Sequence, residues 1–182
     1  MRYFITLLVV LSFVASFGFA ELQSTKSPGE DSFRLSTGLA THFTFPDFEP
    51  ITISPHLGIA YGFSDNFSLG LKTNVTYLSH GFLLFIFDLS AKASYPFPDS
   101  PFALSGSLGG ELMYSLLLVK SNLTFQAWFA YVGVTLHSSL TGALPAANLG
   151  VDIEFNDNLN LLFEVGYSFF APYAAAIVEF NL

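Results

Sequence analysis

The chain has 182 residues, of which 52% are hydrophobic and 11% are charged, and its formal net charge is −8 at pH 7. This balance excludes a nucleic-acid-binding protein, because nucleic acid requires clustered lysine and arginine. It also argues against a soluble β-protein, because a mean hydropathy of +0.54 leaves too few charged side chains to cover a water-exposed exterior.

Residues 1–20 have the three-part pattern of a secretory signal peptide. Arg2 gives the positive start, residues 4–14 form an apolar stretch, and small residues precede the expected cleavage after Ala20. The apolar stretch is shorter than the roughly 20 residues that a membrane-spanning helix needs. The chain contains no cysteine, so neither a disulfide framework nor a lipoprotein is expected. Residues 21–31 are polar and have no hydrophobic period, which predicts a flexible periplasmic lead-in.

After this lead-in, large apolar residues alternate with small or polar ones up to the last residue. In the first segment Phe33, Leu35 and Leu39 alternate with residues such as Arg34 and Ser36. A strand places successive side chains on opposite faces, so each such segment has one apolar face and one polar face. The pattern predicts eight strands, over residues 32–45, 51–63, 67–78, 83–95, 101–114, 144–155, 159–170 and 173–182.

The polar faces consist mainly of Gly, Ser, Ala, Thr and Asn, which cannot form a charged coat against water. We therefore expect the apolar face to meet lipid, and each segment has about the 9–11 residues that a tilted barrel strand needs. Residues 32–182 are thus predicted to form an all-β fold, an eight-stranded antiparallel up-and-down transmembrane β-barrel. We expect a monomer in the cell outer membrane. The rival fold is a soluble lipocalin-like carrier, which would need charge on its exterior.

Two features fit this plan poorly. Pro55 falls inside a predicted strand, although a closed barrel needs bonded backbone N–H groups, so we place it beyond the lipid at the extracellular end. Residues 125–138 are β-like and contain Trp128, the one tryptophan, but a single additional strand would break the even strand number. We expect residues 115–143 to form an extended extracellular hairpin or a folded-over loop. The alternative is an error in the strand register after residue 115.

Several strand–turn–strand units and the last strand resemble the small eight-stranded outer-membrane barrels, the OmpA-type transmembrane domain and its relatives. These are residues 57–78 (LGIAYGFSDNFSLGLKTNVTYL), 91–114 (AKASYPFPDSPFALSGSLGGELMY), 149–169 (LGVDIEFNDNLNLLFEVGYSF) and 173–182 (YAAAIVEFNL). The resemblance covers nearly all of the chain after the leader. It implies outer-membrane lipid as the surroundings, and the barrel-assembly machinery and periplasmic chaperones as partners during biogenesis.

The polar face would line an interior that eight strands leave just wide enough for side chains to fill. Barrel closure places the first strand beside the last, so we predict an ion pair between Arg34 and Glu179. Three cations against six carboxylates give an acidic lumen, in which salt bridges and water satisfy the buried charges. The predicted lumenal network comprises Arg34, Lys72, Asp88, Lys92, Glu111, Asp152, Glu154, Glu164 and Glu179.

The expected function is a structural or surface-interaction role, with the extracellular loops, chiefly residues 115–143 with Trp128, as the contact surface for an unidentified partner. The alternative is a narrow cation-preferring passive channel, because surplus carboxylates attract cations. A lipid-modifying enzyme would need His, Ser and an acid together at the lipid-facing rim. The sequence does not place such a group around His42, His56, His80 or His137, and we expect no catalytic, metal or cofactor site.

Overall fold

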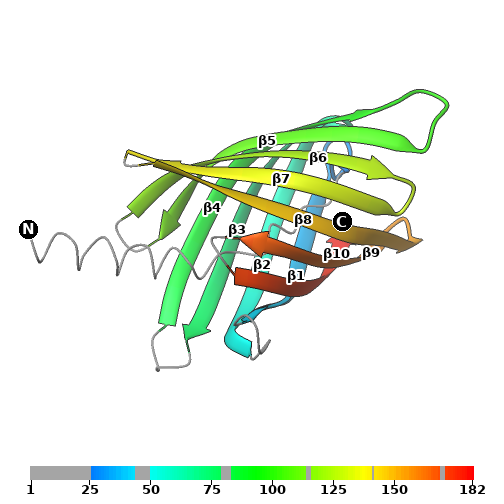
Figure 1. Cartoon of the computed structure of the whole chain (residues 1–182). Helices are drawn as coiled ribbons and strands as arrows, with labels where there is room; N and C mark the ends of the chain where they lie inside the picture. Colours follow the sequence, from blue (N-terminus) through cyan, green and yellow to red (C-terminus); the bar gives the residue numbers. More distant parts are fainter. Residues whose placement is uncertain (1–25, 44–49, 79–82, 114–115, 141, 169–170) are drawn as a thin grey trace, which may run out of the picture.

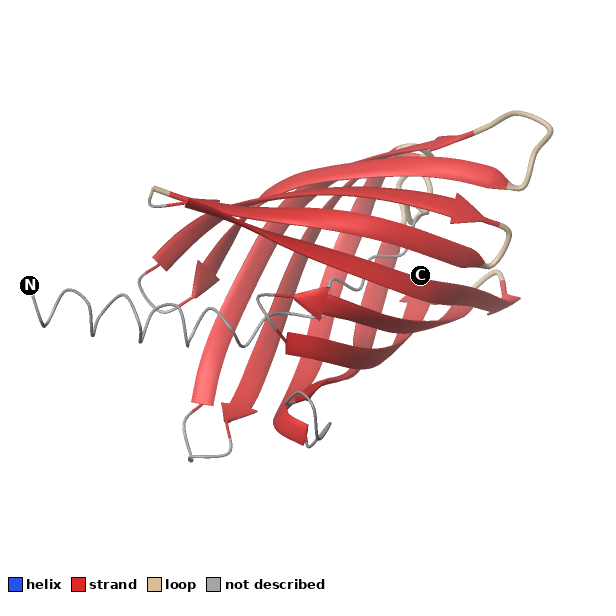
Figure 2. Ribbon diagram, viewed as in Figure 1, coloured by secondary structure: helices blue, strands red, loops and turns tan. Residues whose placement is uncertain are grey.

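The computed structural model describes residues 26–43, 50–78, 83–113, 116–140, 142–168 and 171–182. The expected signal peptide (1–20) and the first part of the lead-in (21–25) lie outside these ranges. The regular structure in them is β-strand (Figure 2). The strands are β1 (Phe33–Phe43), β2 (Pro50–Ser64), β3 (Phe67–Leu78), β4 (Leu83–Pro96), β5 (Phe102–Met113), β6 (Leu116–Ala127), β7 (Ala130–Ser139), β8 (Gly142–Asn156), β9 (Leu159–Ser168) and β10 (Ala171–Asn181). Within the same ranges, no helix has the length and apolar character needed to cross a membrane.

Each strand pairs with its chain neighbours, and β1 pairs with β10, so the sheet closes on itself (Figure 1). All of these pairings are antiparallel, and the closing register runs from Arg34 opposite Asn181 to His42 opposite Tyr173. The predicted antiparallel up-and-down barrel is confirmed, but it has ten strands instead of eight. Closure removes the exposed strand edges that hydrocarbon cannot satisfy.

The two additional strands, β6 and β7, come from the segment that the sequence analysis assigned to an extracellular loop. In β6 the side chains of Leu117, Val119 and Leu123 point outward, whereas those of Lys120 and Asn122 are buried inside. The alternation is hidden at the start of β6, where four apolar residues follow one another in LLLV. Because residues 116–139 form two strands of the barrel, the prediction of an extracellular loop over residues 115–143 was wrong. The strand number stays even because two strands are gained.

The turn between β6 and β7 consists of Trp128 and Phe129, and Trp128 has a φ of 53°. Two bulky aromatic residues lack the Gly, Pro, Asn or Asp that usually marks a turn in a sequence. The Trp128 N–H donates to the carbonyl of Pro101, at 2.9 Å, and Leu182 N–H donates to Phe33 at 2.8 Å. Trp128 thus lies at the end of the barrel that carries the C-terminus, which we call the terminus end; the other is the opposite end.

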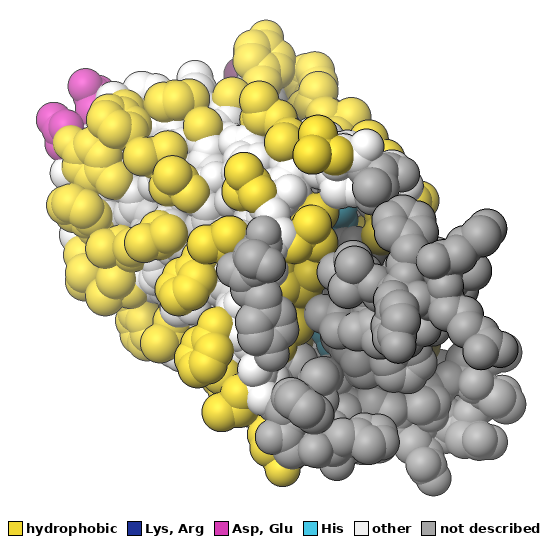
Figure 3. Space-filling model, turned by 90° about the vertical axis from the view of Figure 1, so that its left-hand side faces the viewer, with side chains coloured by type: hydrophobic (Ala, Val, Ile, Leu, Met, Phe, Trp, Pro, Cys, Tyr) yellow, Lys and Arg dark blue, Asp and Glu magenta, His cyan; other side chains and the backbone are white. Residues whose placement is uncertain are grey.

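Apolar side chains cover the outside of the barrel, as Figure 3 shows for one face. Leu39, Leu57 and Leu108, on three different strands, are 56%, 58% and 62% exposed, whereas most charged strand residues are buried in the interior. At the terminus end, aromatic rings pack against one another along the rim. The ring centroids of Phe33 and Tyr61 are 4.9 Å apart, and those of Phe102 and Trp128 are 6.1 Å apart. A closed sheet with an apolar outside, a polar inside and an aromatic rim is a membrane-spanning β-barrel.

Pro55 lies in the half of β2 nearer the opposite end, where it pairs with Leu39 of β1, and its place beyond the lipid stays a prediction. On its other side, the β2–β3 pairing is interrupted at Ser54 and Pro55: Ile53 lies opposite Tyr77, and the next pair is His56 with Asn74. Side chains on the lumen side bridge the strands around this point. Ser54 Oγ lies 2.8 Å from Thr76 Oγ1, and His56 Nδ1 lies 2.9 Å from Asn74 Oδ1. These contacts join the two strands where proline cannot donate a backbone hydrogen bond.

Candidate functional site

The polar residues predicted for the lumen come from seven different strands, and the barrel brings most of them together. Their positions are Arg34 on β1, Lys72 on β3, Asp88 and Lys92 on β4, Glu111 on β5, Asp152 and Glu154 on β8, Glu164 on β9 and Glu179 on β10. Six of these side chains are buried, and Lys72 and Lys92 are half-buried. Glu154 is the exception among them. The register of β8 shifts between Glu154 and Asn156, and the side chain of Glu154 is half exposed at the terminus-end rim.

A buried ion pair inside the barrel joins β4 to β6, the two strands on either side of β5. Lys120 Nζ lies 2.8 Å from Asp88 Oδ2, and both side chains are almost completely buried. On the neighbouring strands, Lys72 lies opposite Asp88 in the β3–β4 register, and Glu111 lies opposite Asp88 in the β4–β5 register. Lys120 therefore balances charge in a region where two carboxylates are neighbours. Sequence reasoning missed this lysine because it assigned its strand to a loop.

His137 continues this network onto β7. Its Nδ1 lies 3.8 Å from Glu111 Oε2, and both side chains are fully buried. Lys120 and His137 also lie opposite each other in the β6–β7 register. Strands β4 to β7 are thus joined through charged or titratable side chains inside the barrel.

A second cluster surrounds Glu164 on the other wall. Its carboxylate accepts hydrogen bonds from Tyr131 Oη at 2.9 Å, Asn148 Nδ2 at 2.6 Å and Tyr173 Oη at 2.6 Å. These four residues belong to β7, β8, β9 and β10. The cluster therefore links four adjacent strands through one fully buried carboxylate.

Two glycines make room for the tyrosines of this cluster. A Cβ atom added at Gly150 would overlap the Tyr131 ring, and one added at Gly166 would lie within 2.7 Å of the Tyr173 ring. Such close approach is a recognised reason for glycine inside a strand. The sequence carries this signal, but it becomes readable only once the strand register is known.

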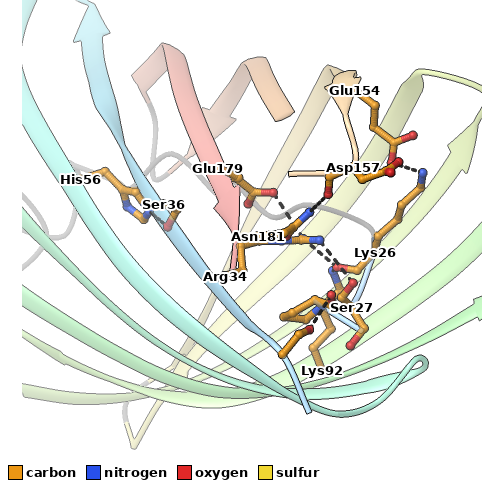
Figure 4. Close-up of polar contacts among 12 residues, drawn as sticks. Lys26, Ser27, Arg34, Ser36, His56, Lys92, Glu154, Asp157, Glu179 and Asn181 are labelled. Atoms are coloured by element: carbon orange, nitrogen blue, oxygen red, sulfur yellow. Dashed lines mark hydrogen bonds and ion pairs between the residues drawn. The ribbon is translucent and has the colours of Figure 1, made fainter. Parts of the chain in front are cut away.

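The predicted ion pair between Arg34 and Glu179 is confirmed, with Nη1 3.3 Å from Oε2 (Figure 4). Arg34 Nε also donates to Asn181 Oδ1 at 2.7 Å. Both side chains of the ion pair are buried near the terminus end, where β1 meets β10. Both terminal nitrogens of the Arg34 guanidinium, Nη1 and Nη2, also donate hydrogen bonds to a segment that precedes the strands.

That segment is residues 26–32, which we call the strap. Its last residues follow the β2–β3 turn: Asp31 N–H donates to the Gly62 carbonyl at 2.9 Å, and Gly62 N–H donates to Ser32 at 3.0 Å. Ser27 Oγ donates to the Ser64 carbonyl at 3.0 Å. A Cβ atom at Gly62 would overlap the carbonyl oxygen of Gly29, so the strap backbone rests directly on this glycine.

The other end of the strap crosses the mouth of the barrel (Figure 4). Arg34 donates to the carbonyls of Lys26 at 3.0 Å and Ser27 at 3.2 Å, and Lys92 Nζ donates to the Lys26 carbonyl at 3.2 Å. The Lys26 ammonium forms an ion pair with Glu154 on β8. Since β2 and β8 are four positions apart in a ring of ten strands, the strap spans most of the mouth. Residues 26–31 of the expected lead-in are thus hydrogen-bonded to the barrel in this structure, and their flexibility stays a prediction.

The strand assignment also changes the charge balance of the lumen. Lys120 joins the predicted cations inside, and Glu154 leaves the interior for the rim. Among the described strands, the inward-facing cations are Arg34, Lys72, Lys92 and Lys120, and the inward-facing carboxylates are Asp88, Glu111, Asp152, Glu164 and Glu179. The predicted three-to-six excess of carboxylates is thus replaced by near balance.

The histidines within the described ranges all face the lumen. His42 Nδ1 lies 3.0 Å from Thr52 Oγ1, and His56 Nε2 lies 3.1 Å from Ser36 Oγ. His80 falls outside the described residues. Lys120, His137, Tyr131, Asn148 and Tyr173 were not among the predicted lumenal residues. The inward positions of β6 and β7 follow from the period-two pattern once both segments are read as strands.

No protein-family model matches the chain, and no curated protein sequence matches it. Solved structures with a similar arrangement include the N-terminal β-barrel domain of Pseudomonas aeruginosa OprF, at 15% identity and a TM-score of 0.47, covering 85% of this chain and 99% of that one. The KdgM porin is 10% identical with a TM-score of 0.43, and the match covers 81% of this chain and 98% of that one. Ail of Yersinia pestis is 10% identical with a TM-score of 0.33, and the match covers 84% of this chain and 99% of that one. At these values the function has to be inferred from the residues of this chain.

Proposed function

We propose that the chain is a monomeric outer-membrane β-barrel protein with a closed lumen and a structural, non-catalytic role. The observation that carries the proposal is the burial of charged side chains at mid-height, on separate walls of the barrel. Glu111, Glu164 and Lys120 are 1%, 2% and 5% exposed. Water reaches almost none of their surface, so a continuous aqueous path does not pass them.

Three layers support closure along the barrel axis. Near the opposite end, Leu84, Ile86 and Met113 form a buried apolar cluster inside the barrel. The ion pair of Lys120 with Asp88 and the Glu164 cluster follow at mid-height. The strap crosses the terminus end. A pore would have to displace all three layers, and each consists of packed or hydrogen-bonded groups.

The location rests on two features of the chain. The secretory leader pattern indicates export, and an apolar exterior around a closed antiparallel sheet fits a bilayer. Assembly would then use the barrel-assembly machinery and periplasmic chaperones. The connections between strands at the opposite end contain only two to six residues, which leaves little chain for an extracellular binding surface and favours a structural role.

A cation-preferring channel is the other candidate from the sequence, and it loses support because the lumenal charges are nearly balanced. Recording from single molecules of refolded mature protein in a planar bilayer tests the choice. We expect no stepwise current at ±100 mV, with insertion verified by protease protection of the same preparation. We also expect no current after deletion of residues 21–31, because the middle and opposite-end layers remain. Stepwise currents from the wild-type protein would contradict the proposal.

A further inference from the structure

Positive charge is concentrated at one place in this acidic protein. The sequence has six Lys and Arg residues, of which Arg2 belongs to the leader and Lys120 pairs with Asp88. The other four line a single cavity of about 60 Å³ inside the terminus end, beneath the strap; they are Lys26, Arg34, Lys72 and Lys92. Their convergence on one small space calls for a physical explanation, because like charges brought together out of water repel one another.

Carboxylates lie close to three of these four cations. Glu179 is the one carboxylate in the lining, and it pairs with Arg34. Lys26 pairs with Glu154 at the rim. Lys72 lies opposite Asp88 in the β3–β4 register, and Asp152 adds a carboxylate on the β8 wall, outside the cavity lining. In the described part of the chain, Lys92 makes its one hydrogen bond to a neutral group, the carbonyl of Lys26, at 3.2 Å.

The cavity also offers neutral hydrogen-bond donors. Ser68 on β3 and Ser90 on β4 line it beside the two lysines of the same strands. Lys72 and Lys92 lie on neighbouring strands, with Ser68 directly opposite Lys92 in the register. A water molecule needs about 10–15 Å³ of such space, so the cavity of about 60 Å³ has room for a compact ion of a few heavy atoms.

We propose that this cavity binds a small oxyanion of the phosphate or sulfate class. Lys72 and Lys92 supply the charge-assisted hydrogen bonds, Ser68 and Ser90 supply hydroxyl donors, and Arg34 holds the strap in place above the ion. The bound anion offsets the repulsion among the cations. The proposal concerns an ion-binding site and holds whether or not the lumen conducts.

The test is calorimetric titration of the refolded mature protein in neutral detergent with sodium phosphate and sodium sulfate, against sodium chloride at equal ionic strength. We expect saturable one-to-one binding of an oxyanion that chloride does not reproduce. Short-chain phosphatidic acid distinguishes a lipid headgroup from a free ion, because a cavity of about 60 Å³ has room for the ion and not for the rest of the lipid. Absence of saturable oxyanion binding, or binding of the lipid only, would overturn the proposal.

Variants locate the site. Lys92→Gln and Lys72→Gln should each weaken oxyanion binding by about tenfold or more, since each removes a charge-assisted hydrogen bond. Lys92→Arg keeps the charge and should stay within about threefold of wild type. Asn66→Asp, at an exposed turn position, is the matched control, because it lowers the net charge by the same one unit and should not change the affinity. Circular dichroism checks the fold of each variant. Equal losses in Asn66→Asp and Lys92→Gln would show a general charge effect and overturn the assignment.

Discussion

The ion pair between Lys120 and Asp88 gives the strongest quantitative prediction. Replacing Lys120 with Met keeps most of its length but removes the ammonium that lies 2.8 Å from the Asp88 carboxylate, which stays buried between Glu111 on β5 and Lys72 on β3. Breaking a buried ion pair by removing one partner costs about 3–5 kcal/mol. The double variant Lys120→Met/Asp88→Leu removes both charges, so we expect it to recover to within about 1–2 kcal/mol of wild type.

The exposed pair of Lys26 with Glu154 provides the matched control. Lys26→Met also removes one ammonium from an ion pair, but both of its side chains are about half exposed. Solvent screens such a pair, and we expect a loss below about 1 kcal/mol. The comparison separates burial from the simple loss of one positive charge.

Urea unfolding of the protein reconstituted in lipid vesicles measures these differences. Circular dichroism follows the strands, and the fluorescence of the one tryptophan, Trp128, follows the terminus-end rim. At an unchanged slope, a shift in midpoint reports a change in the free energy of unfolding. The reasoning fails if Lys120→Met lies within about 1 kcal/mol of wild type, or if the double variant is as unstable as the single one.

Three further predictions follow from the same geometry. Tyr173→Phe removes a 2.6 Å hydrogen bond to the Glu164 carboxylate and should destabilise the barrel by about 1.5–3 kcal/mol in urea unfolding; no measurable loss would remove this bond from the account. Gly62→Ala should displace the strap and speed tryptic cleavage after Lys26 in the folded protein, whereas Gly70→Ala, whose Cβ would lie 3.7 Å from its nearest neighbour, should not; equal cleavage rates would contradict the strap contact. A dansyl group on Leu182→Cys should quench Trp128 fluorescence more strongly than one on Leu140→Cys, since the turn at Trp128 and the C-terminus share one end of the barrel; the reverse order would invalidate the topology.

The architecture was largely predictable because period-two alternation depends only on local sequence. The same pattern placed Arg34 and Glu179 on the first and last strands, and barrel closure then made their pairing predictable. β6 was missed because its apolar start masks the alternation and because Trp128 and Phe129 do not look like turn residues. That error moved Lys120 out of the lumen and, together with the rim position of Glu154 beyond the β8 register shift, produced the apparent excess of carboxylates.

The strap could not be predicted in the same way. Residues 26–32 have no hydrophobic period, and their contacts depend on groups that lie far away in the sequence. The Lys26 carbonyl meets Arg34 and Lys92, and its ammonium meets Glu154 only after ten strands have closed into a ring. The clearance at Gly62, Gly150 and Gly166 likewise depends on the three-dimensional register and not on local propensity.

The most direct test of the central claim is a cysteine scan of residues 116–127, which is clean because the native chain has no cysteine. A spin label at each position, with the protein in lipid vesicles, reports collisions with oxygen dissolved in the bilayer. A lipid-facing strand predicts a period of two, with high oxygen collision at Leu117, Val119, Leu123 and Phe125 and low collision at Leu118, Lys120, Asn122 and Thr124. Uniform accessibility to water-soluble reagents, with no period, would make this segment a loop and contradict the ten-stranded, apolar-outward barrel.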